Sequence, residues 1–295
     1  MRKYISLALG VFLLAATPVI AQPAPPGEVE AYNKKYEALP WIGAPGKPAV
    51  TERAKIVLDP EVRFLDSKGT NALLGLTGNL PESDSYTLAP RQGGWFAVYS
   101  FNDIGFVKDD EKIDADALLK SLRDSQVGGN EERKKQGLEP MTITGWAVPP
   151  HYDAVTHNLE YGITLATASG SNINYHLNML GRRGVMDAAL ITSPETLNSD
   201  LAAFRSANKG FAYLGDEDYA AYKDGDKVSE YGLAALVTGG AAAALLKGGL
   251  LKGLLAGLAA FWKVIAVGAI AFFATIRKFI ARLAGRGKDI GPPSE

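Results

Sequence analysis

Two of the three histidines lie with an aspartate in one short stretch of the chain. His151, Asp153 and His157 fall within seven residues. Imidazole and carboxylate groups are ligands that zinc and other transition metals take from proteins, so the cluster indicates a metal site. Its spacing fits no established metal-binding motif, and Pro149-Pro150 just before it favours a solvated loop as the alternative.

A pair of arginines forms the second candidate group. Arg182 and Arg183 stand between Gly181 and Gly184, in a stretch typical of a turn. Two adjacent guanidinium groups offer paired donors to an anionic ligand, so we take both residues as ligand-binding candidates. The alternative is that they are ordinary solvated residues of a turn.

Carboxylates gather at 109–111 and again at Asp114 and Asp116. Such groups serve acid–base chemistry or bind calcium. They equally suit a solvated turn that leads into a capped helix, and this second interpretation needs no ligand.

Other catalytic signatures are missing from the chain. It contains no Gly-x-Ser-x-Gly sequence, phosphate-binding glycine loop or dinucleotide fingerprint. The absence of cysteine excludes thiol nucleophiles, cysteine metal sites and disulfides. The sequence therefore favours a protein that is not an enzyme and needs no cofactor. The alternative is a metal-dependent hydrolase of envelope material that uses His151, Asp153 and His157.

The segments that must position these residues are typical of an α+β fold. Apolar and β-branched residues dominate 158–168, 172–180 and 185–192, with turn residues between them. Three neighbouring strands joined by tight turns predict an antiparallel meander. A further strand at 142–148 is expected to stop at Pro149-Pro150, and 104–107 is expected to pair with 95–101 across a turn.

Two helices carry clear start signals. Asp114 can cap a helix with an apolar face formed by leucines, and Gly128-Gly129 is expected to interrupt it. Ser193 and Pro194 predict the start of a second helix that ends at Gly210. We therefore expect an antiparallel sheet with flanking helices, in which Trp95 and Trp146 are largely buried.

The N-terminus is typical of a secretory signal. Arg2 and Lys3 precede an apolar run at 5–16, and Val19-Ile20-Ala21 offers a small-residue cleavage site. We predict a signal peptide at 1–21 rather than an uncleaved anchor. Export of a chain without cysteine suits a bacterial periplasm.

The C-terminal part holds the longest apolar run, in which Lys247, Lys252 and Lys263 are the only charges between Glu230 and Arg277. Roughly 20 apolar residues span a membrane, and basic residues flank its cytoplasmic side. We predict a juxtamembrane apolar helix at 231–252, a transmembrane helix at 253–276 and a basic cytoplasmic tail at 277–295. The alternatives are a helix lying on the membrane surface and a hairpin whose first pass is 231–246.

Gly249, Gly253 and Gly257 recur every four residues in this region. That spacing places three glycines on one helix face, where another helix can approach closely. It indicates self-association, although glycine is also common in membrane helices generally.

The domain before the apolar run is acidic. Residues 22–230 contain 21 Lys and Arg against 30 Asp and Glu, a net charge of −9. A surface of this sign argues against nucleic acid as a partner.

Several short motifs together resemble the predicted membrane-anchored bacterial proteins of domain-of-unknown-function family 2167. They are Gly94-Trp95-Phe96-Ala97-Val98-Tyr99, Ile104-Gly105-Phe106-Val107-Lys108-Asp109-Asp110, Ile113-Asp114-Ala115-Asp116, Gly145-Trp146 with Pro149-Pro150-His151-Tyr152-Asp153, Asn174-Tyr175, Leu180-Gly181-Arg182-Arg183-Gly184 and Tyr231-Gly232-Leu233-Ala234-Ala235-Leu236-Val237 with Gly239-Gly240. The resemblance implies an exported domain held by a C-terminal membrane helix, and it assigns no catalytic residue.

Together these patterns predict a single-pass protein of the bacterial inner membrane with residues 22–230 in the periplasm. We expect a binding or scaffolding module whose partners are the lipid bilayer, through the C-terminal helix, and other envelope proteins.

Overall fold

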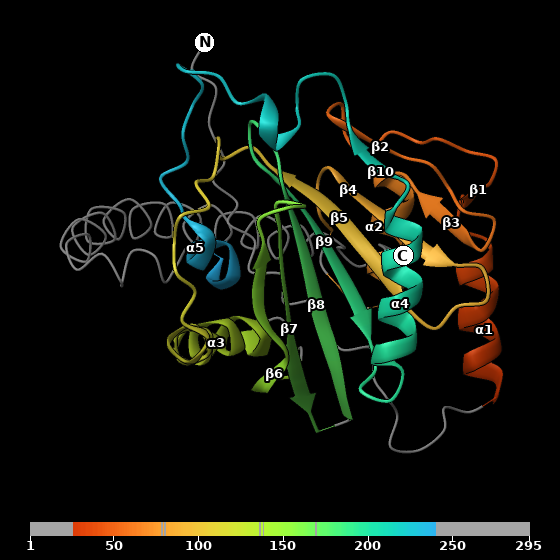
Figure 1. The fold of residues 1–295 in the computed structure, drawn as a ribbon. Coiled ribbons are helices and arrows are strands. Elements are labelled where there is room, and N and C mark those ends of the chain that lie inside the picture. Colours follow the sequence, from red (N-terminus) through yellow and green to blue (C-terminus); the bar gives the residue numbers. More distant parts are fainter. Residues whose placement is uncertain are drawn as a thin grey trace, which may run out of the picture. The chain divides into compact units, whose positions relative to one another are not determined.

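The computed structural model describes residues 26–239, apart from 78, 80, 136, 138 and 169 (Figure 1). The chain divides into two compact units, Met1–Ala243 and Ala244–Glu295, and the fold below is that of the first. The predicted signal peptide, the transmembrane helix at 253–276, the tail and Gly249, Gly253 and Gly257 lie outside the described residues. Within residues 26–239, no helix has both the length and the apolar character needed to cross a membrane.

An eight-stranded sheet forms the centre of the first unit, and every neighbouring pair in it is antiparallel. Its strands, from one edge to the other, are β1 (Ile42–Gly43), β3 (Val62–Leu65), β4 (Ser85–Pro90), β5 (Phe96–Asn102), β9 (Val185–Thr192), β8 (Gly170–Leu180), β7 (Asn158–Thr167) and β6 (Thr142–Asp153). A separate two-stranded sheet pairs β2 (Ala54–Ile56) with β10 (Phe211–Tyr213). The predicted α+β class and the antiparallel meander of β7, β8 and β9 are confirmed.

Helices cover both faces of the large sheet, because side chains alternate between the faces along each strand. On β9, Ala188 and Leu190 belong to the core cluster that includes residues of α4 (Leu197–Asn208), whereas Ala189 and Ile191 pack with Leu74 of α2 (Ser67–Leu76). We call these the α4 face and the α2 face. Figure 1 shows α4 crossing in front of the sheet and α2 behind it.

The core on the α4 face centres on Phe204. Its ring lies 6.0 Å from that of Trp95 and 6.2 Å from that of Tyr175, edge-on in both cases. Trp95 is buried, as the sequence predicts. Trp146 differs from the prediction, because it lies on the edge strand β6 and is only half-buried.

Three further helices pack at the α2 face or at the edge of the sheet. They are α1 (Pro26–Glu37), which contacts α2, α3 (Ala115–Lys135), which packs against β6, and α5 (Leu233–Thr238), which contacts α3. A short 3-10 helix, η1 (Tyr219–Ala221), follows β10. The predicted N-cap of α3 is present, since the Ala117 amide donates to Asp114 Oδ1 at 3.0 Å.

The helix α3 is not interrupted at Gly128-Gly129, contrary to the prediction. Side chains on both sides of the glycines bond to the backbone at the start of β6. Gln126 Oε1 accepts from the Ile143 amide, and Asn130 bonds the amide and the carbonyl of Met141, the residue just before β6. These bonds pair backbone groups at the open edge of the sheet. They also keep α3 helical across Gly128-Gly129.

Three further strand and helix predictions are corrected. The strand β6 runs through Pro149-Pro150, because an edge strand with irregular pairing accommodates residues that lack an amide proton. Residues 104–107 do not pair with β5, since β4 and β9 already occupy both of its edges; Phe106 bridges to Val228 instead. The helix α4 begins at Leu197 because the Ser193 hydroxyl closes a turn onto the Thr196 amide.

Candidate functional site

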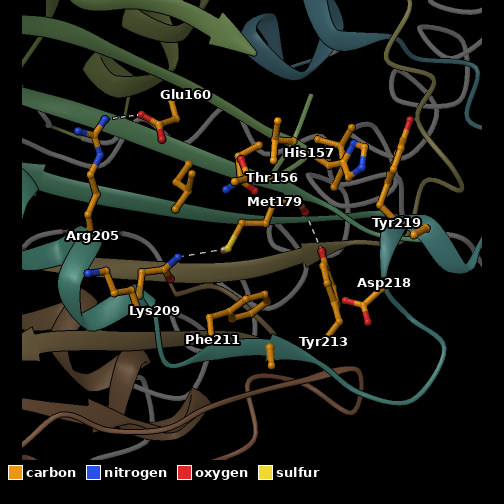
Figure 2. A pocket seen from close by; sticks show the side chains of 17 residues that line it. Thr156, His157, Glu160, Met179, Arg205, Lys209, Phe211, Tyr213, Asp218 and Tyr219 are labelled. Atoms are coloured by element: carbon orange, nitrogen blue, oxygen red, sulfur yellow. Dashed lines mark hydrogen bonds and ion pairs between the residues drawn. The ribbon is translucent and has the colours of Figure 1, made fainter. Parts of the chain in front are cut away.

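A pocket of about 700 Å³ opens on the α4 face of the sheet, between β8, α4 and β10 (Figure 2). Its lining comes from three stretches of the sequence, 155–160, 177–180 and 205–220: Val155, Thr156, His157, Asn158, Glu160, Leu177, Met179, Leu180, Arg205, Asn208, Lys209, Phe211, Ala212, Tyr213, Asp218, Tyr219 and Ala220. This volume matches that of small-molecule sites in proteins, which are concave and mostly apolar.

The floor of the pocket is apolar and held by hydrogen bonds from its neighbours. Tyr213 donates its hydroxyl to the Met179 carbonyl at 2.7 Å and accepts the Met186 amide at 3.1 Å. Burial raises the pKa of Tyr213 above its usual range, so this hydroxyl stays protonated as the donor. Asn208 accepts the hydroxyl of the buried Tyr99 and places its amide 3.4 Å from Met179 Sδ. The floor is therefore formed before any ligand arrives.

Two cations mark one side of the rim. Arg205 pairs with Glu160 on β7 and places its guanidinium 5.9 Å from the ring centre of Tyr175. Burial acts to lower the pKa of Arg205, but its hydrogen bonds and charge interactions with Glu160 and Tyr175 together outweigh burial and raise that pKa. Lys209 follows at the C-terminal end of α4, exposed and, within the described part of the chain, without an ion pair.

The opposite end of the pocket is aromatic. The ring of His157 lies 4.2 Å from that of Tyr219, and Figure 2 shows the pair across from Arg205 and Lys209. His157 Nδ1 lies 3.0 Å from the Tyr152 hydroxyl, which donates to Asp109 Oδ2 at 2.8 Å. Burial first, and this bond second, raise the pKa of Tyr152. The Tyr152–Asp109 contact thus orients the histidine ring at the mouth of the pocket.

The predicted metal ligands are spread along the β6–β7 hairpin. His151 is exposed on β6, Asp153 Oδ1 accepts the Val155 amide at 2.8 Å to shape the turn, and His157 lies 3.8 Å from Asp109. Among the residues that the structure describes, no three His, Asp or Glu side chains lie close enough to share a metal ion. Of the three, His157 alone lines the pocket.

The two candidate arginines point at carboxylates of the same chain. Arg182 Nε and Nη2 donate to the two oxygens of Asp226 at 2.6 and 2.9 Å, and Nη1 bonds Asp216. Arg183 bonds Glu217. Arg182 is also buried, with 6% of its surface exposed. This arrangement ties the turn between β8 and β9 to residues 216–226.

Sequence reasoning missed Arg205, Lys209, Asn208 and Tyr213 as site residues. No spacing signal links them to β8, since contacts such as Tyr213–Met179 join residues 34 positions apart. One available signal was the end of the helix itself: Arg205 and Lys209 lie one turn apart near its C-terminus, on the same side as Asn208.

The fold and the pocket are those of an α+β protein with a ligand-sized cavity on one face of an antiparallel sheet. The chain belongs to the family described as "Protein of unknown function (DUF2167)", which it matches over residues 43–273. The resemblance seen in the sequence motifs is thereby confirmed.

Two other comparisons add little to this assignment. No curated protein matches the chain. Among solved structures, the solution structure of cyanobacterial PsbP (CyanoP) from Synechocystis sp. PCC 6803 matches with a TM-score of 0.35 and 9% identity, covering 57% of this chain and 92% of that one. Likeness at this level supports no argument about function.

Proposed function

We propose that this protein is a ligand-binding module of the bacterial envelope, anchored in the inner membrane by its C-terminal helix, with the pocket on the periplasmic side. The pocket binds an elongated, mostly apolar molecule that ends in an acidic group. The observation that carries this proposal is the apolar floor of the pocket beside the Arg205–Lys209 rim.

The floor supplies the affinity for the apolar part of the ligand. Leu177, Met179 and Phe211 line the cavity with carbon and sulfur atoms, and apolar surface removed from water contributes about 25 cal/mol per Å². Because Asn208 and Tyr213 are already hydrogen-bonded, a ligand does not have to order them on binding.

The rim supplies the preference for an acidic end group. Arg205 is engaged by Glu160, so Lys209 is the cation free to meet a carboxylate, sulfonate or phosphate. This position stands out because the domain as a whole is acidic, at −9 for residues 22–230. The predicted export signal and anchor would keep the pocket near the membrane, into which apolar molecules partition from water.

The test uses residues 22–239, which retain α5 and are first checked for a cooperative thermal transition, and the anionic apolar dye 1-anilinonaphthalene-8-sulfonate. We expect saturable binding with a fluorescence increase. Lys209→Glu should weaken it about tenfold, the equivalent of about 1.4 kcal/mol. The matched control is Lys134→Glu, which reverses an exposed lysine on α3 away from the pocket.

Two outcomes would contradict the proposal. One is dye binding that does not saturate, which would mean adsorption to scattered apolar surface. The other is an equal loss of affinity in Lys134→Glu, which would mean that overall charge rather than the rim attracts the dye.

A further inference from the structure

The short strand β10 borders the pocket and pairs with β2 along one edge only. The Gly210 carbonyl and the Leu214 amide, at the two ends of β10, bond to backbone groups of the 53–57 segment that contains β2. Backbone groups of an antiparallel strand point alternately to its two sides. The amides and carbonyls of Phe211 and Tyr213, at the odd positions between these bonds, therefore point away from β2.

This second edge of β10, which we call the open edge, has no strand beside it in the described part of the chain. Within that part, no backbone group bonds the amides or carbonyls of Phe211 and Tyr213 on this side. Both residues are half-buried and Ala212 between them is exposed. Sheet edges are usually covered, or protected by charged residues or proline, and β10 contains neither residue type. The open edge is therefore suited to pair with a further strand.

The open edge runs along the pocket. Phe211, Ala212 and Tyr213 all line the pocket although their side chains alternate in direction, and no residue of β2 lines it. The Phe211 ring lies 6.4 Å from that of the buried Tyr99, and the Tyr213 hydroxyl bonds the Met179 carbonyl, so both side chains turn toward the large sheet. A molecule in the pocket thus meets the large sheet on one face and the backbone of β10 along one side (Figure 2).

We propose that the pocket binds an extended peptide with a free C-terminal carboxylate, which joins β10 as a third, antiparallel strand of the small sheet. The inference rests on the proposed function and names its ligand class. Pairing with an open sheet edge is an established mode of peptide recognition. Peptide residues opposite Phe211 and Tyr213 exchange backbone hydrogen bonds with them. Their side chains lie on the same face as those two rings, directed toward Leu177 and Met179 on the pocket floor.

The charges at the two ends of the pocket determine the direction of the peptide. Lys209 lies just before β10, and Asp218 lines the pocket beyond its other end. In an antiparallel pair, the C-terminus of the peptide lies beside the N-terminal end of β10, so the carboxylate meets Lys209. The reverse direction would place the carboxylate beside Asp218 and is disfavoured. A fatty acid has the acidic end but no amide groups to pair with the open edge.

The test uses the full chain in lipid nanodiscs and a hexapeptide of alternating leucine and serine, with a fluorophore on its N-terminus and a free C-terminal serine carboxylate. In the expected register the last two leucines lie opposite Phe211 and Tyr213. Fluorescence anisotropy should show saturable binding. N-methylation of these two leucine amides removes the donors that face β10 and should weaken binding about tenfold or more. The matched control peptide is N-methylated at the last two serines, whose amides face away from β10, and should bind within about twofold of the parent.

The acidic end is tested separately. A peptide that ends in a carboxamide should bind about tenfold more weakly than the carboxylate, and Lys209→Glu should abolish this preference. Lys134→Glu, on α3, should retain it.

Three results would overturn the inference. Equal effects of leucine and serine N-methylation would mean that no strand forms beside β10. Displacement of the dye 1-anilinonaphthalene-8-sulfonate by dodecanoate but not by the peptide would assign the pocket to a lipid. If the dye binds with the expected dependence on Lys209 and the peptide does not bind, this inference fails and the proposed function stands; if neither binds, both fail.

Discussion

Trp95 and Trp146 illustrate how position within one sheet sets the role of a residue. Trp95 is 5% exposed, lies just before the central strand β5 and packs edge-on against Phe204. Trp146 lies half-buried on the edge strand β6, where its indole donates to the Ala115 carbonyl at 3.1 Å. Trp95 therefore packs in the core, whereas Trp146 forms a hydrogen bond that joins α3 to the edge of the sheet.

Replacement of these tryptophans should separate the two roles. Trp95→Ala should lower the free energy of unfolding by about 3–5 kcal/mol, as for other large buried aromatic side chains. Trp146→Ala should cost less, because part of its ring is already in water. Denaturant unfolding of both variants measures the difference, and equal losses would contradict this account.

The ion pair of Arg182 makes a prediction about pH. Hydrogen bonds from Arg182 and from the Lys223 amide lower the pKa of Asp226 to about 2, against about 3.9 in an unfolded chain. A lowered acid pKa stabilises the fold at pH values above the unfolded pKa, and this contribution disappears as pH falls through the folded pKa. The stability deficit of Asp226→Asn should therefore be full above pH about 4 and shrink between pH about 4 and 2.

The control for this experiment is Asp224→Asn, an exposed neighbour in the same loop. Its unfolding free energy should follow that of the unaltered protein at every pH. A deficit in Asp226→Asn that stays constant down to pH about 2 would show that its charge does not matter.

At the scale of elements, α3 and the β8–β9 turn use glycine for different reasons. A Cβ added to Gly128 in the middle of α3 would meet nothing within 4 Å. A Cβ added to Gly184 in the turn would lie 2.0 Å from the Asn102 carbonyl oxygen. Only the turn requires glycine, because there two backbone segments touch.

Alanine at these two glycines should therefore act in opposite directions. Gly128→Ala should stabilise the protein by about 0.5–1 kcal/mol, since a helix interior favours alanine over glycine. Gly184→Ala should destabilise it by about 1–3 kcal/mol, as other overpacking substitutions do. Thermal unfolding of the two variants gives the comparison, and a destabilised Gly128→Ala would mean that α3 is broken at this point.

At the scale of the whole molecule, charge bears on topology. Five basic residues follow the predicted span at 253–276, against Lys247 and Lys252 before it. The positive-inside rule therefore favours one span with a cytoplasmic C-terminus over a hairpin that would return the tail to the periplasm. The two arrangements place Glu295 on opposite sides of the membrane.

A reporter that is active only in the periplasm distinguishes them. Fused after Asp226, it should be active, and fused after Glu295, it should be silent. Activity at both positions would reject the single span and support the hairpin.

Local patterns in the sequence sufficed for the meander, the Asp114 cap and the burial of Trp95. Alternation, capping and turn chemistry depend on residues within a few positions of one another, so one segment carries the whole signal. Asn172, Asn174, His176 and Asn178 likewise stand at every second position of β8, although their burial is not visible in the sequence.

Contacts between distant residues were decided only by the tertiary structure. The sequence indicates Arg182 as a ligand-binding candidate or a solvated turn residue, and only the fold brings Asp226, 44 positions later, against it. The pocket joins β7, β8, α4, β10 and η1, and the continuity of α3 depends on bonds to β6. Which strands neighbour each other, and which side chains then meet, depends on the packing of the whole sheet, and no single stretch of sequence contains that information.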